Sequence, residues 1–339
     1  MSKRTVAIYP DSTNKEYKRD WCKAFGEGVN KFSDKWEGRV INGNDFSKID
    51  HNAEFSFVFN YQFETLDQCR KTTHKFRRKV FEKHFNDGKV FTFDGDVLIS
   101  YGDMISQQYN GLLDEMRRGL RYVRIPMAHV YEPKAKFFIK DNYEDRWEKI
   151  KKERKIIPQN YNLNIGDQIL IVCNRGLEGY SGMGVPAWKF AIESLVELRK
   201  HTKRPITIRW HRATNGHRKT DNTELENFLV QNPQYRKDLN VQCRSLGNFP
   251  KLIDEIKKSY AVVTLGSSAA TPAIVEGKPL FVKAPECFFH KWRSGELSDI
   301  ENPNINIDRV SFYKKYCFSH YNYIELRNGE YWKNVKDEL

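Results

Sequence analysis

A short run of small and hydroxyl-bearing residues carries the clearest chemical signal in this sequence. The β-branched stretch Val263–Leu265 leads directly into Gly266, Ser267 and Ser268, and a helix-like stretch begins at Ala269. A strand that passes through such a turn into a helix offers backbone N–H groups and two hydroxyls to an anion. The turn therefore predicts a diphosphate-binding site. The alternative is an N-capped core helix that binds no ligand.

Glu276 lies further along the same expected helix, about two turns after the turn. A carboxylate there can accept hydrogen bonds from a ribose diol, as an acidic residue does in dinucleotide-binding folds. We therefore place Glu276 with the turn in one predicted nucleotide site. A surface glutamate with no ligand is the alternative.

Two further apolar runs end in polar side chains. Asn174 and Arg175 follow one run, and Arg209 and His211 close another. An arginine can pair bidentately with a phosphate, and a histidine can donate to it. Ligands bind at the carboxyl ends of parallel strands, so these four residues join the predicted donor site. The glycine-rich stretch after Asn174 is not a Walker A motif, because the Gly-Lys-Ser/Thr ending is absent.

Basic residues form two local clusters in the first half of the chain. The stretch from Arg70 to Lys83 carries seven basic residues with interleaved aromatic residues and one acid, and a second cluster has no acid among its arginines. The candidate contacts are Arg70, Lys71, Lys75, Arg77, Arg78, Lys79, Arg117, Arg118, Arg121 and Arg124. Such side chains grip nucleic-acid phosphates whatever the base sequence. A solvated helix face is the alternative.

Composition limits the classes of protein that this chain can belong to. It has 339 residues, a formal net charge of +13 and 39% hydrophobic residues. A broadly basic folded protein suits a polyanionic partner or a phosphate-bearing substrate, although a surface adapted for solubility gives the same charge. No apolar run is long enough to span a membrane, and no secretory signal is recognisable. The six cysteines and nine histidines show no zinc spacing, so we expect free, mostly buried thiols and no metal site.

The order of apolar runs predicts a two-part α/β protein. Strands are expected at 5–9, 55–59, 89–93, 168–172, 205–210, 240–243, 260–265 and 279–283. Helices are expected at about 17–32, 65–84, 250–258 and 269–276, and a further helix is expected to begin at Pro186. Strands that alternate with helices indicate βαβ units and a parallel sheet. We therefore expect two facing Rossmann-like domains at residues 1–160 and 161–290. Residues 291–339 are expected to form a C-terminal helical segment that packs back on them.

Several segments together resemble a known group of enzymes. The Gly266–Pro279 segment looks like the donor-binding segment of glycosyltransferases with two facing Rossmann domains, the GT-B architecture. With Ile169–Arg175, Leu198–His211 and Ile300–Trp332, it resembles the DNA glycosyltransferases of tailed phages over roughly residues 165–335. The chain departs from that group's patterns in two places. It has Arg209-Trp210-His211-Arg212 in place of Arg-Pro-His-Pro, and Gly266 in place of an asparagine.

The resemblance implies a transferase that moves a sugar from a UDP-sugar to a hydroxymethylated pyrimidine in double-stranded phage DNA. The target base would flip out of the stack. An inverting enzyme of this kind needs a base for the acceptor hydroxyl, and Asp94, Asp96 and Asp103 are the candidates. The alternative for Asp94 and Gly95 is a simple turn.

The resemblance also implies a setting and a set of partners. No permanently bound cofactor is expected, although a Mg²⁺ or Mn²⁺ ion held by the donor diphosphate would leave no sequence motif. We expect a monomer in the cytoplasm of an infected bacterial host, with no membrane partner. Two other classes remain open. One is a GT-B-fold enzyme with a non-DNA acceptor, such as a polysaccharide glycosyltransferase or a nucleotide-sugar epimerase, and the other is a non-catalytic nucleic-acid-binding module.

Overall fold

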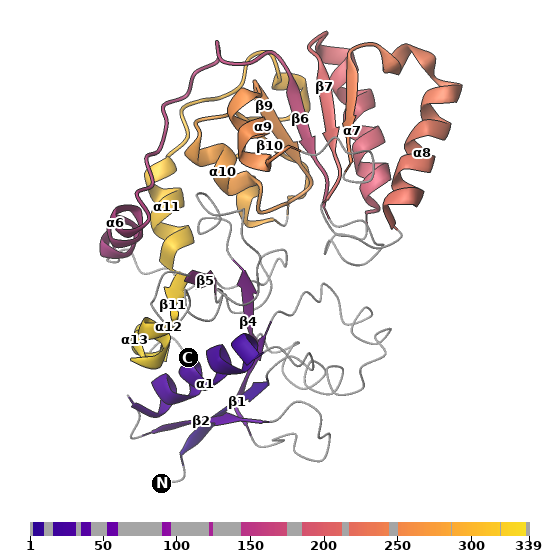
Figure 1. Ribbon diagram of the computed structural model, residues 1–339. Coiled ribbons are helices and arrows are strands. Elements are labelled where there is room, and N and C mark those ends of the chain that lie inside the picture. The colour runs from indigo at the N-terminus through magenta and orange to yellow at the C-terminus, as the bar shows by residue number, and fades with distance from the viewer. Residues whose placement is uncertain are drawn as a thin grey trace. The chain divides into compact units, whose positions relative to one another are not determined.

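Figure 1 shows a computed structural model of the chain. The structure describes residues 3–9, 16–31, 35–41, 53–59, 90–95, 122–124, 144–174, 185–211, 217–243, 250–285, 287–318 and 320–336. The chain divides into two compact units. Unit 1 comprises Met1–Ile150 and Tyr313–Leu339, and unit 2 comprises Lys151–Phe312. The expected C-terminal segment 291–339 is therefore shared, because its first part belongs to unit 2 and its last part to unit 1.

Unit 1 is built on a six-stranded mixed sheet in the order β11-β5-β4-β3-β1-β2. Its strands are β1 (Arg4–Tyr9), β2 (Trp36–Val40), β3 (Phe55–Phe59), β4 (Val90–Gly95), β5 (Tyr122–Arg124) and β11 (His320–Asn322). Strands β1 to β4 are mutually parallel, whereas β5 runs antiparallel to both β4 and β11. Strand β2 was not predicted from the sequence, because Glu37, Gly38 and Arg39 interrupt its apolar character at the sheet edge.

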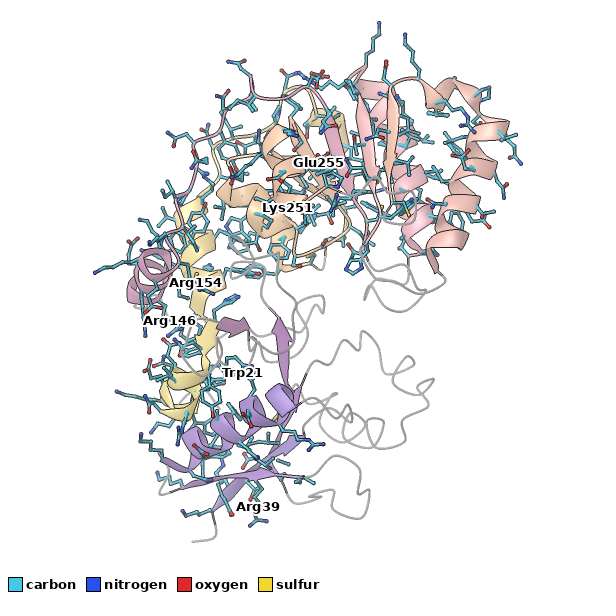
Figure 2. The ribbon with its side chains drawn as sticks, viewed as in Figure 1. Trp21, Arg39, Arg146, Arg154, Lys251 and Glu255 are labelled. Carbon is cyan, nitrogen blue, oxygen red and sulfur yellow. The ribbon has the colours of Figure 1, made fainter. Side chains whose placement is uncertain are left out.

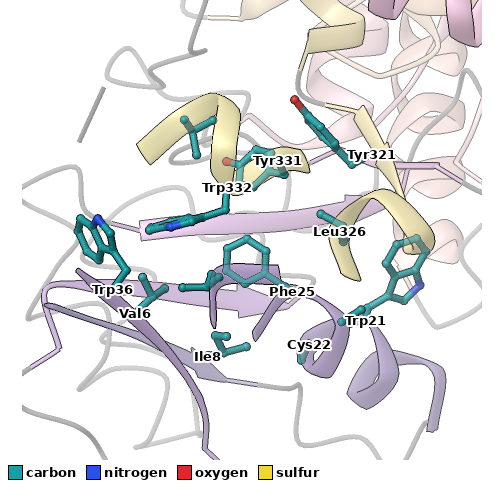
Figure 3. Packing of buried hydrophobic residues seen from close by; sticks show 13 residues of the cluster. Val6, Ile8, Trp21, Cys22, Phe25, Trp36, Tyr321, Leu326, Tyr331 and Trp332 are labelled. Carbon is teal, nitrogen blue, oxygen red and sulfur yellow. The ribbon is translucent and has the colours of Figure 1, made fainter. Parts of the chain in front are cut away.

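Three helices of unit 1 bury an aromatic core against this sheet: α1 (Glu16–Lys31), α12 (Tyr323–Arg327) and α13 (Glu330–Val335). Unit 1 also contains parts of α6 (Glu144–Glu153) and α11 (Arg309–Phe318), each of which extends into unit 2. Figure 3 shows Phe25 of α1 packed with Tyr331 and Trp332 of α13. The rings of Trp332 and Trp36 pack edge to face, with their centroids 5.1 Å apart. This core joins the two ends of the chain in one unit.

Unit 2 is built on a five-stranded parallel sheet in the order β10-β9-β6-β7-β8. Its strands are β6 (Ile169–Val172), β7 (Ile206–Arg209), β8 (Leu239–Gln242), β9 (Ala261–Thr264) and β10 (Leu280–Val282). Every residue of β6, β7, β9 and β10 is buried, as expected for parallel strands with helices on both faces. This order, read along the sheet, is the doubly wound arrangement that the alternating pattern predicts.

The helices of unit 2 connect these strands. They are α7 (Ala187–His201), α8 (His217–Gln231), α9 (Leu252–Lys258) and α10 (Ala270–Val275), with 3₁₀ turns at Pro233–Arg236, Phe288–Trp292 and Leu297–Asp299. The apolar face of α7 places Phe190, Leu195 and Leu198 in the core. The sequence did not reveal α8, because its residues are mostly polar and few of them, Leu225 and Leu229 among them, are buried apolar anchors.

Candidate functional site

The strand order of unit 2 fixes where a ligand would bind. The chain passes from β6 to β7 on one side and reaches β9 on the other, so β6 and β9 are neighbours at the point where the winding reverses. Val172 and Thr264 lie side by side at their carboxyl ends. In open α/β sheets, ligands bind at the carboxyl edge beside this switch point. The residues that follow β6 and β9 are therefore the first candidates.

Hydrogen bonds to the Thr264 and Ser267 hydroxyls stabilise the turn after β9. The Thr264 hydroxyl accepts a hydrogen bond from the backbone N–H of Ser267 at 2.9 Å, and the Ser267 hydroxyl accepts one from Ala269 at 3.2 Å. Among the described residues, none accepts the backbone N–H of Ser268, and both serines are half-buried. The helix that follows, α10, has only six residues, so its dipole is smaller than the sequence suggested. The turn can still donate to an anion through its backbone.

Asn174 follows β6 at the same edge. The residue is only 8% exposed, and its Oδ1 is buried with no hydrogen-bond partner among the described residues. Unsatisfied buried polar groups are rare, and each demands an explanation such as an unseen ligand or water. Asn174 therefore fits the donor site that the sequence predicts. Arg175, its neighbour in that prediction, lies outside the described residues.

The end of β7 differs from the expectation. Arg209 is 5% exposed, and its guanidinium donates to the Gln242 side chain at 2.9 Å and to the Pro250 carbonyl at 2.7 Å. Both terminal nitrogens are thus held by protein groups. His211, two residues further on, is exposed at the same edge. The structure therefore places His211 at the carboxyl edge of the sheet, whereas Arg209 is bonded within the protein.

Glu276 lies away from the turn. Helix α10 carries the chain from the carboxyl end of β9 back to the amino end of β10, so its two ends lie at opposite edges of the sheet. The six residues of α10, which lie between the turn and Glu276, give about 9 Å of helix rise. A nucleotide whose diphosphate occupies the turn does not place its ribose at the opposite edge. Glu276 therefore does not join the Gly266–Ser268 turn in one site.

Local contacts explain what Glu276 does instead. Its Oε1 lies 3.7 Å from Nζ of Lys257, an ion-pair distance too long for a hydrogen bond. Burial raises the pKa of the Glu276 carboxyl, and the charge of Lys278 offsets part of that rise. The next residue, Gly277, has φ +60° and packs so closely on Asn160 that a Cβ would overlap the Asn160 carbonyl oxygen. The carboxyl-terminal end of α10 therefore packs against Asn160, in the segment that leads into β6.

Two polar groups near the carboxyl edge were missed by sequence reasoning. Thr271 Oγ1, in the first turn of α10, and Trp210 Nε1, directly after β7, are buried and have no hydrogen-bond partner in the part of the chain that the structure describes. Neither residue type stands out in a helix or a strand, so the sequence offered no signal for them. Only the position of each beside the switch point makes its unused capacity notable.

Residues from two motifs of the resemblance contact each other in unit 2. Arg204, from the Leu198–His211 segment, donates to both carboxylate oxygens of Glu301, at 3.0 and 3.2 Å, and stacks on the Tyr260 ring. The Thr202 hydroxyl donates to the same carboxylate. These contacts hold the residues after α7 against Glu301.

Unit 1 contains the predicted base and DNA contacts, and little of that prediction falls on described residues. Asp94 lies within β4, opposite Arg124 of β5, so Asp94 and Gly95 extend a strand and do not form a turn. It still lies at the carboxyl end of β4. Asp96 and Asp103 lie outside the described residues, as do all the predicted DNA contacts except Arg124.

The described residues contain no cluster of His, Cys, Asp and Glu that could hold a metal ion. Five cysteines fall among them, and all five are buried and free of disulfide bonds. None of the described helices is long and apolar enough to cross a membrane.

Comparison with known proteins gives the fold a wider context. No protein-family model matches the chain, and no curated protein matches it. The Thermosulfurimonas dismutans KpsC beta Kdo 2,7 transferase has a TM-score of 0.50 at 13% identity, covering 99% of this chain and 100% of that one. The beta Kdo 2,4 transferase of the same KpsC has a TM-score of 0.50 at 11% identity, covering 93% and 91%.

A third solved structure, the Staphylococcus aureus MnaA–UDP complex, covers 99% of this chain and 95% of its own at 10% identity. Its TM-score of 0.30 is too low to carry an argument. The two KpsC structures show that this chain has the α/β fold of GT-B-type glycosyltransferases. At such low identity the likeness concerns the fold and not the substrate.

Proposed function

We propose that this protein is a glycosyltransferase that takes its sugar from a nucleotide-sugar bound at the carboxyl edge of the unit 2 sheet. The observation that carries the proposal is the buried, unpartnered amide oxygen of Asn174 at the switch point of a GT-B-type fold. The other donor residues are Arg175, His211, Gly266, Ser267 and Ser268. A UDP-sugar is the first donor to test, and a Mg²⁺ or Mn²⁺ ion would arrive with its diphosphate.

Asp94 is the proposed base, because it lies at the carboxyl end of β4 in unit 1. The acceptor hydroxyl oxygen would bond to the anomeric carbon while the bond from that carbon to the phosphate oxygen breaks. The hydroxyl proton would pass to the carboxylate, and the nucleotide would leave with the electron pair. A carboxylate can perform this task when it accepts the proton as the new bond forms.

Two acceptors follow from different observations. The net charge of +13, the basic clusters and the sequence resemblance favour a hydroxymethylated pyrimidine in double-stranded DNA. The solved relatives by fold, which are named as Kdo transferases, favour a saccharide acceptor. We propose the DNA base as the acceptor and treat the saccharide as its rival.

One experiment separates these possibilities. The full chain is incubated with a panel of labelled nucleotide-sugars, each with duplex DNA carrying hydroxymethylcytosine or hydroxymethyluracil, or with an acidic oligosaccharide. Nucleoside mass spectrometry and chromatography then locate the label. Label on the base supports the DNA proposal, and label on the saccharide supports the rival.

Two other results would contradict a transferase altogether. A donor sugar that is rearranged without transfer would indicate an epimerase. Binding of DNA together with no affinity for any nucleotide-sugar would indicate a non-catalytic nucleic-acid-binding module.

A further inference from the structure

Three buried polar side chains form a continuous chain across β7, β8 and α9. Arg209 donates from Nη1 to Oε1 of Gln242 at 2.9 Å, and Gln242 donates from Nε2 to Oε2 of Glu255 at 2.6 Å. All three residues are at most 7% exposed. Glu255 lies in the first turn of α9 and is labelled in Figure 2. A buried cation and a buried carboxylate are thus connected through one amide.

The register of the sheet explains why this chain can form. Arg209 and Gln242 are directly paired across β7 and β8, so their side chains leave the same face of the sheet. The amide of Gln242 has only one compatible orientation, because the guanidinium offers donors alone and the carboxylate offers acceptors alone. The bridge therefore balances two charges that would be costly to bury singly.

The three hydrogen-bonded side chains also hold both ends of the β8–α9 connection at the carboxyl edge. Gln242 ends β8, and the second guanidinium nitrogen of Arg209 donates to the carbonyl of Pro250, where the described chain resumes before α9. Arg209 and Glu255 thus fix the points at which the β8–α9 connection leaves the sheet and enters the helix. Connections at this edge are where doubly wound sheets bind ligands.

We infer that Arg209 is a positioning residue of the nucleotide-sugar site and not a ligand of its phosphates. The inference rests on the proposed function, and it reverses the role that the sequence suggested. Both guanidinium ends are already bonded, and Glu255 supplies the balancing charge through Gln242. Arg209 acts on the donor by holding the end of β7 against β8 and against Pro250, and so by placing His211, two residues later, at the carboxyl edge.

A charge-preserving swap tests this role. In the double variant Gln242→Glu with Glu255→Gln, the carboxylate introduced at position 242 accepts from Arg209 and from the amide introduced at position 255. The geometry and the net charge of the three side chains are therefore kept. Each single variant is a matched control that breaks the charge balance. Arg209→Lys keeps the charge but cannot reach Gln242 and Pro250 together.

The measurements are calorimetric affinities for uridine diphosphate and for uridine, and kcat and KM for transfer from the donor that the panel identifies. For a positioning residue, the swap keeps the affinity for uridine diphosphate within about twofold, and Arg209→Lys lowers kcat by about 10- to 100-fold. The swap also restores the kcat that each single variant loses.

Two results would overturn the inference, and they differ. If Arg209 binds phosphate, the carboxylate introduced at position 242 competes for it, so the swap loses roughly tenfold or more in affinity for uridine diphosphate while uridine affinity stays unchanged. A wild-type protein that binds no nucleotide in the panel would refute the proposed function itself, and the inference with it. Failure of the single variants to fold leaves the swap and Arg209→Lys to decide.

Discussion

The buried ion pair of unit 1 allows a quantitative test of the structure. Arg146 of α6 donates from its two terminal nitrogens to Glu325 of α12 at 3.2 and 3.0 Å, and the two side chains are 8% and 3% exposed. Lys149 also donates to Glu325, and Arg146 stacks 3.8 Å from the Tyr321 ring centroid. Arg146 is labelled in Figure 2.

We predict that Glu325→Gln destabilises unit 1 by about 3 kcal/mol, the lower end of the range for removing one partner of a buried pair. The substitution keeps the shape but leaves the Arg146 charge buried without its counterion. One oxygen must also replace two, because Oε2 accepts the backbone N–H of Asn322 as well as Arg146. The lower end is appropriate because the Tyr321 ring and two backbone carbonyls still contact the guanidinium.

Denaturant unfolding followed by hydrogen exchange and mass spectrometry measures this loss, because peptides from α12 and α7 report on the two units separately. Glu197→Gln is the control. That side chain is 39% exposed and pairs with Lys200 at 2.7 Å, so its loss costs at most about 0.5 kcal/mol. A Glu325→Gln effect on α12 as small as the control would refute the reasoning about buried charge.

The same pair predicts a pH dependence. Burial acts to raise the pKa of the Glu325 carboxyl, but Arg146, Lys149 and the Asn322 N–H outweigh it and hold that pKa below the usual 4.5. A carboxyl whose folded pKa is depressed stabilises the protein above its unfolded pKa, and this contribution is lost as the pH falls through the folded value. The difference between wild type and Glu325→Gln should therefore be full at neutral pH and should shrink below about pH 4.5.

The remaining predictions concern packing and the site. Gly28→Ala should destabilise unit 1 by about 1–3 kcal/mol, because the new Cβ would overlap the Leu326 carbonyl oxygen. Gly26→Ala is the control and should be nearly neutral in the same unfolding experiment, because the nearest atoms to its Cβ are side-chain atoms at 3.1 and 3.2 Å. Glu276→Ala should leave the affinity for uridine diphosphate within about twofold by calorimetry, and a loss of tenfold would return Glu276 to the donor site. Asp94→Asn should lower kcat by about 10²–10⁴-fold with both ligands still bound, and a variant with near-normal turnover would direct attention to Asp96 and Asp103.

The sequence by itself determined the class of fold and where along the chain the buried strands of unit 2 end. Runs such as Ile169–Val172 and Ala261–Thr264 are apolar or β-branched throughout, a pattern typical of strands buried on both faces, and polar residues follow each run closely. The edge strand β2 and the polar helix α8 escaped prediction, because tertiary contacts and not local pattern stabilise them.

Only the tertiary structure decided what each polar residue at a strand end does. Arg209 and Asn174 look alike in sequence, since each ends an apolar run. Yet Arg209 donates to Gln242 and Pro250, whereas no described residue donates to the amide oxygen of Asn174. Glu276 looked close to Ser268 because eight residues are few in sequence, but a helix that returns the chain across the sheet separates them to opposite edges. Hydrogen-bond partners come from other strands and helices, so the pattern of one segment cannot show whether a polar group is already used.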